Sequence, residues 1–268
     1  MSERVKSIRS RDNPQVKALV KLAGSSRERR RTGSTLLEGD HLVRAYRDSG
    51  GTAETIIASE SAFSRSETRD LVECAPARAR YVLADRLLEL ISQLVSASGV
   101  AAVIRTPRQR PFPPVLPDCV ALENIQDPGN LGSILRSAAA AALTHVFLSR
   151  GSVFAWAPKV IRAGMGAHFF LSIYENIELS EVRRAFRGTV VALDPRAKES
   201  LYTADLTGPV AWLLGNEGAG LSQGALHLAA RRVRIPMPGP AESLNVAAAA
   251  AVCLFEQVRQ RQYSPPSR

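Results

Sequence analysis

Cysteine and histidine are scarce in this chain, which contains three cysteines and four histidines among 268 residues. The cysteines, Cys74, Cys119 and Cys253, are far apart and odd in number, and no CxxC pair occurs. This usage argues against a disulfide framework and against a zinc site. The histidines have no metal-ligand spacing either. We therefore expect a protein that binds no metal.

Long apolar runs are also absent from the sequence. No stretch of about 18 consecutive apolar residues occurs, so we expect no membrane-spanning helix. The first residues, MSERVKSIRSRDNPQ, are charged and lack the apolar segment of a secretion signal. These absences predict a cytoplasmic protein.

Positive charge, in contrast, is abundant, with a formal net charge of +10 and a pI near 10.1. Residues 1–115 hold most of the excess, with 20 Lys and Arg against 13 Asp and Glu. Such a balance favours a polyanionic partner, most commonly nucleic acid, although a merely soluble basic protein is the alternative. We expect the first part of the chain to bind this polyanionic partner. The candidate contacts are Arg9, Arg11, Arg27, Arg30 and Arg31.

A proline-rich stretch, RTPRQRPFPPVLPD at 105–118, divides the chain. Proline fixes φ and removes a hydrogen-bond donor, so this stretch is neither a helix nor a central strand. We expect a first domain at 1–108, a linker at 109–117, a second domain at 118–262 and a disordered tail at 263–268.

Helical and strand patterns alternate in both domains. The first domain has helical patterns near 13–31, 38–49, 65–74 and 85–93 and strand patterns at 55–59, 81–84 and 99–105, which predicts a small α/β fold. The second has apolar strand runs at 119–125, 145–149, 168–174, 189–194, 209–214 and 231–236 between helices at 131–142, 157–164, 180–187, 222–229 and 243–260. Such strands predict a mostly parallel sheet covered on both faces. Ligands of these sheets bind beyond the carboxyl ends of the strands, here the loops after 125, 194, 214 and 235.

Three of these loops carry unusual polar residues. In the first, DPGNLGSILRS at 127–137, Asn130 reads as a helix cap, whereas Arg136 in an otherwise apolar helix needs an anionic partner. The second, LLGNEGAGLS at 213–222, is a glycine-rich turn that allows close approach of a ligand or simply connects two elements. In the third, Ser243 reads as a cap of an alanine-rich helix, and Asn245 is left without an obvious role.

Taken together, DPGNLGSILR, GNEGAGLS and IPM with ESLNVAAAAAV resemble the three motifs of the SpoU (TrmH-type) RNA ribose methyltransferases of the SPOUT superfamily. The resemblance covers residues 118–260. The segments IRSRDNPQVKALVKL and TLLEGDHLV resemble the substrate-binding domain of many members, which has a ribosomal-protein-like α/β fold.

The resemblance implies a knotted parallel sheet, a deep trefoil formed by residues from about Leu213 onwards, which is otherwise nearly absent from proteins. It also implies a homodimer joined through the knotted domain, in which residues of both subunits form each active site. The implied cofactor is S-adenosylmethionine. Its expected binding residues are Leu193, Gly215, Asn216, Gly220, Ile235, Met237, Leu244 and Asn245.

The family's catalytic positions fall on Asn130, Arg136, Glu217, Ser243 and Asn245. The implied reaction transfers a methyl group to a ribose 2′-hydroxyl of RNA. Arg136 is expected to hold the phosphate beside the target ribose, because a guanidinium with a pKa above about 12 is a reluctant base. The segment APKVIRAGMGAHFFL resembles the family's connecting segment and adds Lys159 and Arg162 as candidate RNA contacts.

Other functions remain open at this point. A base methyltransferase of the same superfamily is disfavoured by the third motif, and a phosphate-loop nucleotide enzyme by the absence of GK[ST]. An RNA-binding or ribosome-assembly protein without catalysis is disfavoured by the retained polar residues. Ribosomal RNA, of the 23S type, is preferred over transfer RNA as substrate because a basic front domain suits a large folded target.

Overall fold

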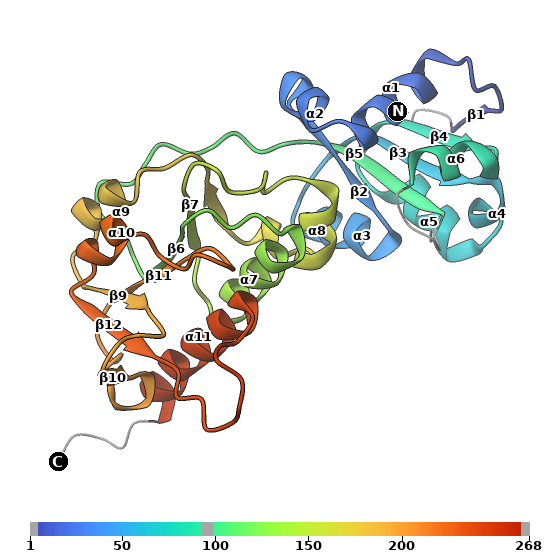
Figure 1. Cartoon of the computed structure of the whole chain (residues 1–268). Helices are drawn as coiled ribbons and strands as arrows, with labels where there is room; N and C mark the ends of the chain where they lie inside the picture. The colour runs from blue at the N-terminus through green and yellow to red at the C-terminus, as the bar shows by residue number, and fades with distance from the viewer. Residues whose placement is uncertain (1–4, 93–98, 264–268) are drawn as a thin grey trace. The chain divides into compact units, whose positions relative to one another are not determined.

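The computed structural model describes residues 5–92 and 99–263, and the chain forms two compact units (Figure 1). The first unit comprises the described residues up to Arg108 together with Trp156–Phe169. The second comprises Gln109–Ala155 and the described residues from Phe170 onward. The segment Trp156–Phe169 thus lies outside the unit to which the sequence assigned it. The predicted tail at 264–268 is outside the described residues.

The first unit is built on a five-stranded mixed sheet with the order β1-β4-β3-β5-β2. Its strands are β1 (Lys6–Ile8), β2 (Ser34–Glu38), β3 (Ala53–Ser59), β4 (Ala77–Leu83) and β5 (Val100–Arg105). Its helices are α1 (Pro14–Gly24), α2 (Ser26–Thr32), α3 (Asp40–Asp48), α4 (Glu60–Phe63), α5 (Ser66–Cys74), α6 (Asp85–Ile91) and α8 (Pro158–Gly164), with a 3-10 turn at Ala167–Phe169. The expected α/β organisation is present, with β1, β2 and α4 as additions.

The basic segment 13–31, expected as one helix, is two helices. Asn13 accepts a hydrogen bond from the backbone N–H of Gln15 and starts α1. Ser25 then adopts extended backbone, and its hydroxyl accepts from the N–H of Glu28 to start α2. Gly33, in the left-handed region with φ 62°, ends α2. Local capping by a serine therefore breaks the helical pattern.

The second unit contains a seven-stranded sheet with the order β10-β12-β9-β11-β6-β7-β8. The strands are β6 (Cys119–Leu122), β7 (His145–Leu148), β8 (Ser172–Tyr174), β9 (Thr189–Leu193), β10 (Glu199–Ser200), β11 (Val210–Leu214) and β12 (Arg231–Arg234). All neighbouring strands pair in parallel, as the apolar runs predict. The carboxyl ends of β6, β9, β11 and β12 therefore lie at one edge. The knotted path of the chain stays a prediction.

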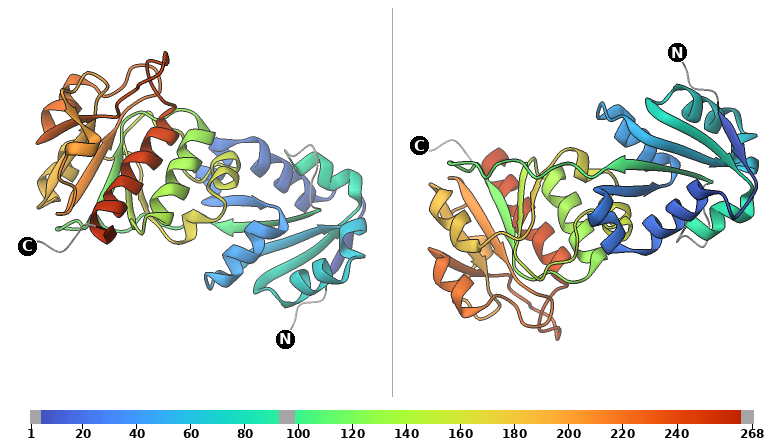
Figure 2. Two further views of the ribbon diagram at one scale, coloured as in Figure 1. Left: turned by 90° about the horizontal axis from the view of Figure 1, so that it is seen from below. Right: turned by 90° about the horizontal axis from the view of Figure 1, so that it is seen from above.

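Helices cover this sheet, namely α7 (Pro128–Ala140), α9 (Leu179–Ala185), α10 (Gln223–Leu228) and α11 (Val246–Tyr263), with a 3-10 turn at Leu201–Thr203. Helices α7 and α11 lie side by side (Figure 2). The indole N–H of the fully buried Trp212 on β11 donates to Gln257 on α11 at 2.6 Å, which fixes α11 against the sheet. No helix among the described residues is long and apolar enough to cross a membrane.

The apolar run at 168–174 was predicted as one strand, and this prediction is wrong for its first half. Ala167–Phe169 is a 3-10 turn of the first unit, and only Ser172–Tyr174 forms β8. Phe170, at the boundary of the two units, is 67% exposed. An apolar run gives no sign of where the chain passes from one unit to the other, because both segments bury apolar residues.

Candidate active site

A tight loop follows β11 and forms the centre of the candidate site. The backbones of Asn216 and Gly220 exchange two hydrogen bonds, N–H to oxygen, at 3.1 and 2.9 Å. A Cβ at Gly215 would collide with the backbone of Gly220 and Leu221. Gly220 itself has a φ of 69°. Both glycines are thus required by the loop's own geometry.

Asn216 holds this loop together through its side chain. Its Oδ1 accepts from the backbone N–H groups of Gly218 and Ala219, both at 3.0 Å. Its Nδ2 donates to the carbonyl oxygen of Asn124, in the loop that follows β6, at 2.8 Å. Asn216 therefore orders the loop and ties it to the neighbouring strand.

The start of α7 differs from the expected arrangement. Asp127 caps this helix, since its Oδ1 accepts from the N–H of Asn130 at 2.7 Å. Asn130 lies inside the first turn and is not the cap, so its side chain is available for other contacts. The reading of Asn130 as a helix cap is therefore wrong.

The start of α11 also corrects the sequence interpretation. Asn245, and not Ser243, caps the helix, because the Oδ1 of Asn245 accepts from the N–H groups of Ala247 at 2.9 Å and Ala248 at 3.3 Å. Ser243 is exposed and has no hydrogen bond to another described residue. The role that the sequence left open for Asn245 is thus partly a structural one.

A chain of hydrogen bonds joins these three loops. The Nδ2 of Asn245 donates to the Oδ1 of Asn130 at 2.8 Å, and the Nδ2 of Asn130 donates to the Oε1 of Glu217 at 3.1 Å. The same carboxylate oxygen accepts from the N–H of Asp127 at 3.2 Å. We call Glu217, Asn130 and Asn245 the carboxamide relay. It connects residues 87 and 115 positions apart in the sequence.

The relay keeps Glu217 ionised. Partial burial raises the pKa of the Glu217 carboxyl, but the hydrogen bond from Asn130 and backbone hydrogen bonds outweigh burial, so the pKa is lowered overall. A carboxylate at this position is a fixed negative charge and a poor proton acceptor near neutral pH.

A cavity beside the relay gathers most of the residues expected to bind a cofactor. Its lining includes Leu193, Gly215, Asn216, Gly220, Ile235, Met237 and Leu244, together with Glu217 and Ser243. Asn130, Arg136 and Asn245 are not among its lining residues. The lining also includes residues that the sequence analysis missed, namely Pro195, Leu214, Gly218, Glu242, Val246 and Ala249. Each of these lies close in sequence to an expected residue, which is the signal that could have found it.

The composition of this cavity fits S-adenosylmethionine. Apolar side chains and glycine backbone from the ends of β9, β11 and β12 offer a surface for a flat adenine ring. The carboxylates of Glu217 and Glu242 lie on the lining and are complementary to a positively charged sulfonium. Within residues 5–92 and 99–263, no group of three or more potential metal ligands is found.

Arg136 lies apart from the relay on the exposed face of α7. The helix buries Leu131, Ile134, Leu135 and Ala138 instead. No ion pair or hydrogen bond joins the Arg136 guanidinium to another described residue. The described residues thus supply no anionic partner for Arg136, although the sequence led us to expect one.

The basic residues of the first unit are mostly exposed. Arg9 pairs with Glu60 at 2.7 Å, and Arg31 pairs with Glu28 at 2.6 Å. Arg11, Arg27 and Arg30 are exposed. Arg29, within the same cluster, is buried and donates to the carbonyl oxygens of Leu22 and Ala23. The cluster therefore combines one structural arginine with exposed ones.

The two candidates on α8 have different surroundings. Lys159 is exposed. The Nη1 of Arg162 lies 2.9 Å from the Oε2 of Glu38, and their side chains are 21% and 3% exposed. The protein itself thus holds the Arg162 guanidinium in a largely buried ion pair of the first unit, and a contact of Arg162 with RNA stays a prediction.

Comparison with protein families matches both parts of the chain. The description "SpoU rRNA Methylase family" applies to residues 118–255 and "MRM3-like substrate binding domain" to residues 13–102. A tRNA/rRNA methyltransferase of Synechocystis, described as uncharacterised, is 33% identical over 96% of this chain and 95% of its own length. The 23S rRNA (guanosine(2553)-2′-O)-methyltransferase RlmP of Bacillus subtilis is 30% identical over 94% of this chain and 98% of its own.

Solved structures share the fold over nearly the whole chain. The SpoU methyltransferase AviRb from Streptomyces viridochromogenes, in complex with the cofactor AdoMet, is 29% identical and has a TM-score of 0.84 over 94% of this chain and 100% of its own. An AdoMet-bound rRNA methyltransferase from Sinorhizobium meliloti is 29% identical and has a TM-score of 0.83 over 97% of this chain and 99% of its own. The three motifs, the parallel sheet and these matches agree, and the chain belongs to the SpoU rRNA methylase family.

Proposed function

We propose that this protein transfers a methyl group from S-adenosylmethionine to a ribose 2′-hydroxyl of ribosomal RNA in the cytoplasm. The observation that carries the proposal is the carboxamide relay at the edge of the cavity, which unites polar residues of all three motifs. The names of relatives such as RlmP of Bacillus subtilis, a 23S rRNA 2′-O-methyltransferase, support the reaction and the substrate class.

The chemistry requires positioning more than activation. S-adenosylmethionine supplies a methyl group already activated by its sulfonium. The ribose oxygen forms a bond to the methyl carbon as the carbon–sulfur bond breaks, and the hydroxyl proton leaves to a base or to water. The protein must therefore hold the two reacting atoms in line. Glu217, kept ionised by Asn130, stabilises the positive charge of the bound cofactor, and Asn245 fixes Asn130 in place.

Arg136 acts, in this proposal, in the active site of a second copy of the chain. Within one chain it points away from the buried face of α7 and has no described partner. A homodimer formed through the second unit would bring its guanidinium to the neighbouring site, where it holds a phosphate beside the target ribose. Phe255 of α11 and Leu244 before it are exposed apolar residues suited to such an interface.

Mixed dimers test the shared site. Arg136→Ala and Asn245→Ala variants are expected to be inactive as homodimers. A mixed dimer then contains one site with both wild-type residues, so random mixing restores about a quarter of the wild-type rate if each site spans two subunits. If the mixture stays as inactive as its parents, Arg136 serves the site of its own chain.

The substrate is tested by offering unmodified RNA of each class. Labelled S-adenosylmethionine is incubated with transcripts of large-subunit rRNA, small-subunit rRNA and transfer RNA. We expect label in large-subunit rRNA. Label in transfer RNA alone would show that transfer RNA, and not ribosomal RNA, is the substrate. Cofactor binding without transfer to any of these RNAs would favour a ribosome-assembly protein with weak catalysis.

A further inference from the structure

Glu123 follows β6 at the edge of the sheet where the candidate site lies. Its backbone N–H donates to the carbonyl oxygen of Leu214 at 2.9 Å, which continues the parallel pairing of Leu122 with Leu214. Leu214 is the last residue of β11, and the residue Glu123 is half-buried. Glu123 is thus fixed at the point where the glycine-rich loop leaves β11.

The side chain of Glu123 contacts the residue at which the same loop ends. Its Oε2 accepts from the backbone N–H of Ser222 at 2.7 Å, and its Oε1 accepts from the Ser222 hydroxyl, also at 2.7 Å. The Ser222 Oγ accepts in turn from the N–H of Ala225 at 3.1 Å and caps α10. A hydroxyl donates and accepts at once, so these contacts coexist. A carboxylate acceptor makes both bonds to Ser222 stronger than bonds between neutral groups.

Glu123 therefore contacts the residues on both sides of the segment 215–221, which we call the glycine loop. Three of its seven residues are glycine. Glycine loses more conformational freedom on ordering than any other residue, so this loop needs contacts that keep it in one shape. The backbone bonds between Asn216 and Gly220 order the loop from within, and Glu123 joins its two ends from outside.

The shape of the glycine loop matters for the cofactor cavity. The loop supplies five lining residues of this cavity, namely Gly215, Asn216, Glu217, Gly218 and Gly220. Glu123 and Ser222 are not among the lining residues. Binding costs less conformational entropy when the loop that surrounds the ligand is already ordered. A contact outside the cavity can therefore raise the affinity for the cofactor without touching it.

We propose that Glu123 is a positioning residue for S-adenosylmethionine, whose carboxylate holds Ser222 and thereby keeps the glycine loop in its binding shape before the cofactor binds. Glu123 acts through the loop and not on the reacting atoms. The proposal rests on the function proposed above, because it takes the cavity as the site of that cofactor. Weakening the contact should lower the affinity for the cofactor and leave the rate at saturating cofactor nearly unchanged.

The test measures binding of S-adenosylmethionine to the full-length protein by calorimetry, without RNA. Glu123→Ala removes both hydrogen bonds to Ser222. Glu123→Gln removes the charge but keeps a side-chain oxygen for the Ser222 N–H and an amide that donates to the Ser222 Oγ. Ser222→Ala removes only the hydroxyl and keeps the N–H that Glu123 holds. Thermal unfolding of each preparation shows that the variant is folded.

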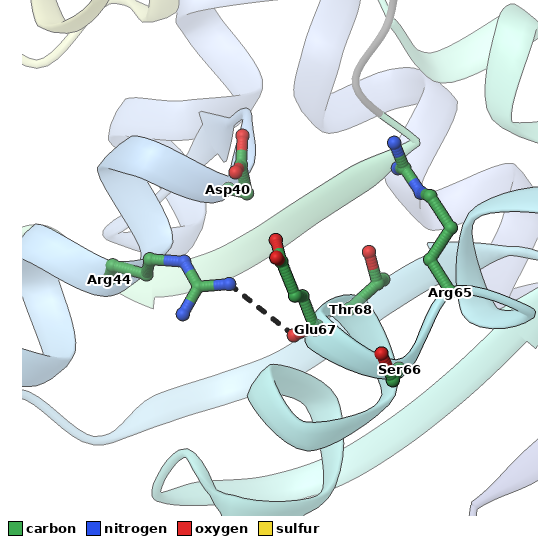
Figure 3. A pocket seen from close by; sticks show the side chains of 6 residues that line it. All are labelled: Asp40, Arg44, Arg65, Ser66, Glu67 and Thr68. Atoms are coloured by element: carbon green, nitrogen blue, oxygen red, sulfur yellow. Dashed lines mark hydrogen bonds between the residues drawn. The ribbon is translucent and has the colours of Figure 1, made fainter.

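Two controls remove comparable polar contacts elsewhere. The Asp205 carboxylate accepts from the N–H and the hydroxyl of a single residue, Thr207, at 3.0 and 2.6 Å, so Asp205→Ala removes a contact of the same kind before the start of β11. Arg44→Ala removes a contact within the first unit, where the guanidinium donates to the carbonyl oxygen of Glu67 at 3.3 Å (Figure 3). Neither Asp205 nor Arg44 is among the residues that line the cofactor cavity.

We expect Glu123→Ala to bind S-adenosylmethionine about tenfold more weakly than the wild type, Ser222→Ala and Glu123→Gln about threefold, and both controls equally well. In methyl transfer, KM for the cofactor should rise with the dissociation constant in Glu123→Ala, whereas kcat stays within about twofold. Unchanged affinity in folded Glu123→Ala would overturn the proposal and leave Glu123 a purely structural residue. Equal weakening by Glu123→Gln and Glu123→Ala would also overturn it, since that pattern assigns the effect to negative charge. If Glu123→Ala does not fold, unchanged affinity in Ser222→Ala overturns the proposal.

Methyl transfer to ribosomal RNA is measured on the same preparations. Transfer by the wild type together with full cofactor affinity in Glu123→Ala would remove the positioning role and leave the proposed function intact. Weaker cofactor binding in Glu123→Ala without transfer by the wild type would do the reverse.

Discussion

At the scale of single residues, the direction of the carboxamide relay follows from which groups donate and accept. A carboxylate only accepts, so Asn130 must turn its Nδ2 toward Glu217. The helix N–H groups only donate, so Asn245 must turn its Oδ1 toward them. The remaining Oδ1 of Asn130 and Nδ2 of Asn245 then match each other. Each amide in the relay therefore has a single workable orientation.

Replacing Asn130 tests the electrostatic part of this relay. Asn130→Ala removes a hydrogen bond that lowers the pKa of Glu217, while the burial that raises it remains. A carboxyl whose pKa is lower in the folded state stabilises the fold above its ordinary pKa, and this contribution is lost as the pH falls through the folded value. The variant should thus lose stability at pH 7 and lose less below pH 4.5, measured by urea unfolding, and solvent screening of the exposed Glu217 keeps this loss small.

The control is the same substitution in a Glu217→Gln background. There the loss on removing Asn130 should not vary with pH, because no carboxyl titrates at that position. A pH-dependent loss of equal size in both backgrounds would assign the effect to another group.

Gly215 provides a steric prediction. Gly215→Ala places a Cβ against the backbone of Gly220 and Leu221, so the backbone of this loop, which lines the cavity, must shift. We expect affinity for S-adenosylmethionine, measured by calorimetry, to fall about tenfold or more. Gly224→Ala on α10 is the matched control, because its Cβ would meet only the Ser222 Oγ at 3.7 Å. Unchanged affinity in Gly215→Ala would show that the loop does not shape the cofactor site.

At the scale of elements, the start of α11 combines two tasks in one side chain. The Oδ1 of Asn245 caps the helix, and its Nδ2 holds Asn130. The helix end thus positions the relay, and the alanine-rich body of α11 packs against α7. Helix capping and the contact with Asn130 thus share one side chain, so a substitution that separates them is informative.

Two substitutions at Asn245 separate these tasks. Asn245→Ala should destabilise the protein by about 1 kcal/mol and abolish methyl transfer, because both contacts are lost. Asn245→Asp keeps a capping oxygen but cannot donate to Asn130, so stability should recover while methyl transfer stays low. Thermal unfolding and initial rates measure the two effects. Recovery of both by aspartate would reduce Asn245 to a helix cap.

Helices and strands were predictable where buried apolar residues form a run or a regular pattern in the sequence. Apolar runs such as Val210–Leu214 marked the parallel strands, because strands buried on both faces contain few polar residues. This rule did not predict the strand β2. It begins with Ser34 and Thr35, which are buried only because Ser34 donates to Glu54 and Thr35 donates to the backbone oxygen of Trp156, 20 and 121 residues away. No local pattern contains such partners.

At the scale of the whole molecule, the segment Trp156–Phe169 belongs to the first unit although sequence-neighbouring strands belong to the second. Its contacts explain this membership, since Arg162 pairs with Glu38 and Trp156 accepts a hydrogen bond from Thr35. The chain thus crosses between the two units after Arg108, after Ala155 and after Phe169. A boundary drawn from proline content alone cannot reveal the later passages.

Arg162 gives a prediction at this scale. Arg162→Ala breaks a largely buried ion pair and should cost about 3 kcal/mol of stability. Lys159→Ala on the same helix, where the side chain is exposed, should leave stability unchanged within about 0.5 kcal/mol. Denaturant unfolding compares the two. An Arg162→Ala protein as stable as wild type but weak in RNA binding would contradict the structural role and support Arg162 as an RNA contact.

The candidate site itself was predictable from motifs to a large extent, but not its internal geometry. Most residues expected to bind the cofactor line one cavity, since parallel strands bring their carboxyl ends together. The pairing of Asn130 with Glu217 and Asn245 depends on three loops meeting, which sequence separation hides. The exposed position of Arg136 follows from which face of α7 packs against the rest of the second unit, and its action in the site of a second chain stays a proposal.

The most direct measurement of the central claim is the chemical position of the transferred methyl group. Large-subunit rRNA methylated with labelled S-adenosylmethionine is hydrolysed in alkali, which cleaves the RNA backbone only next to a free 2′-hydroxyl. Methylation of the ribose predicts label in alkali-resistant dinucleotides, and this label should be absent with Arg136→Ala. Label in mononucleotides would place the methyl group on a base and contradict the account.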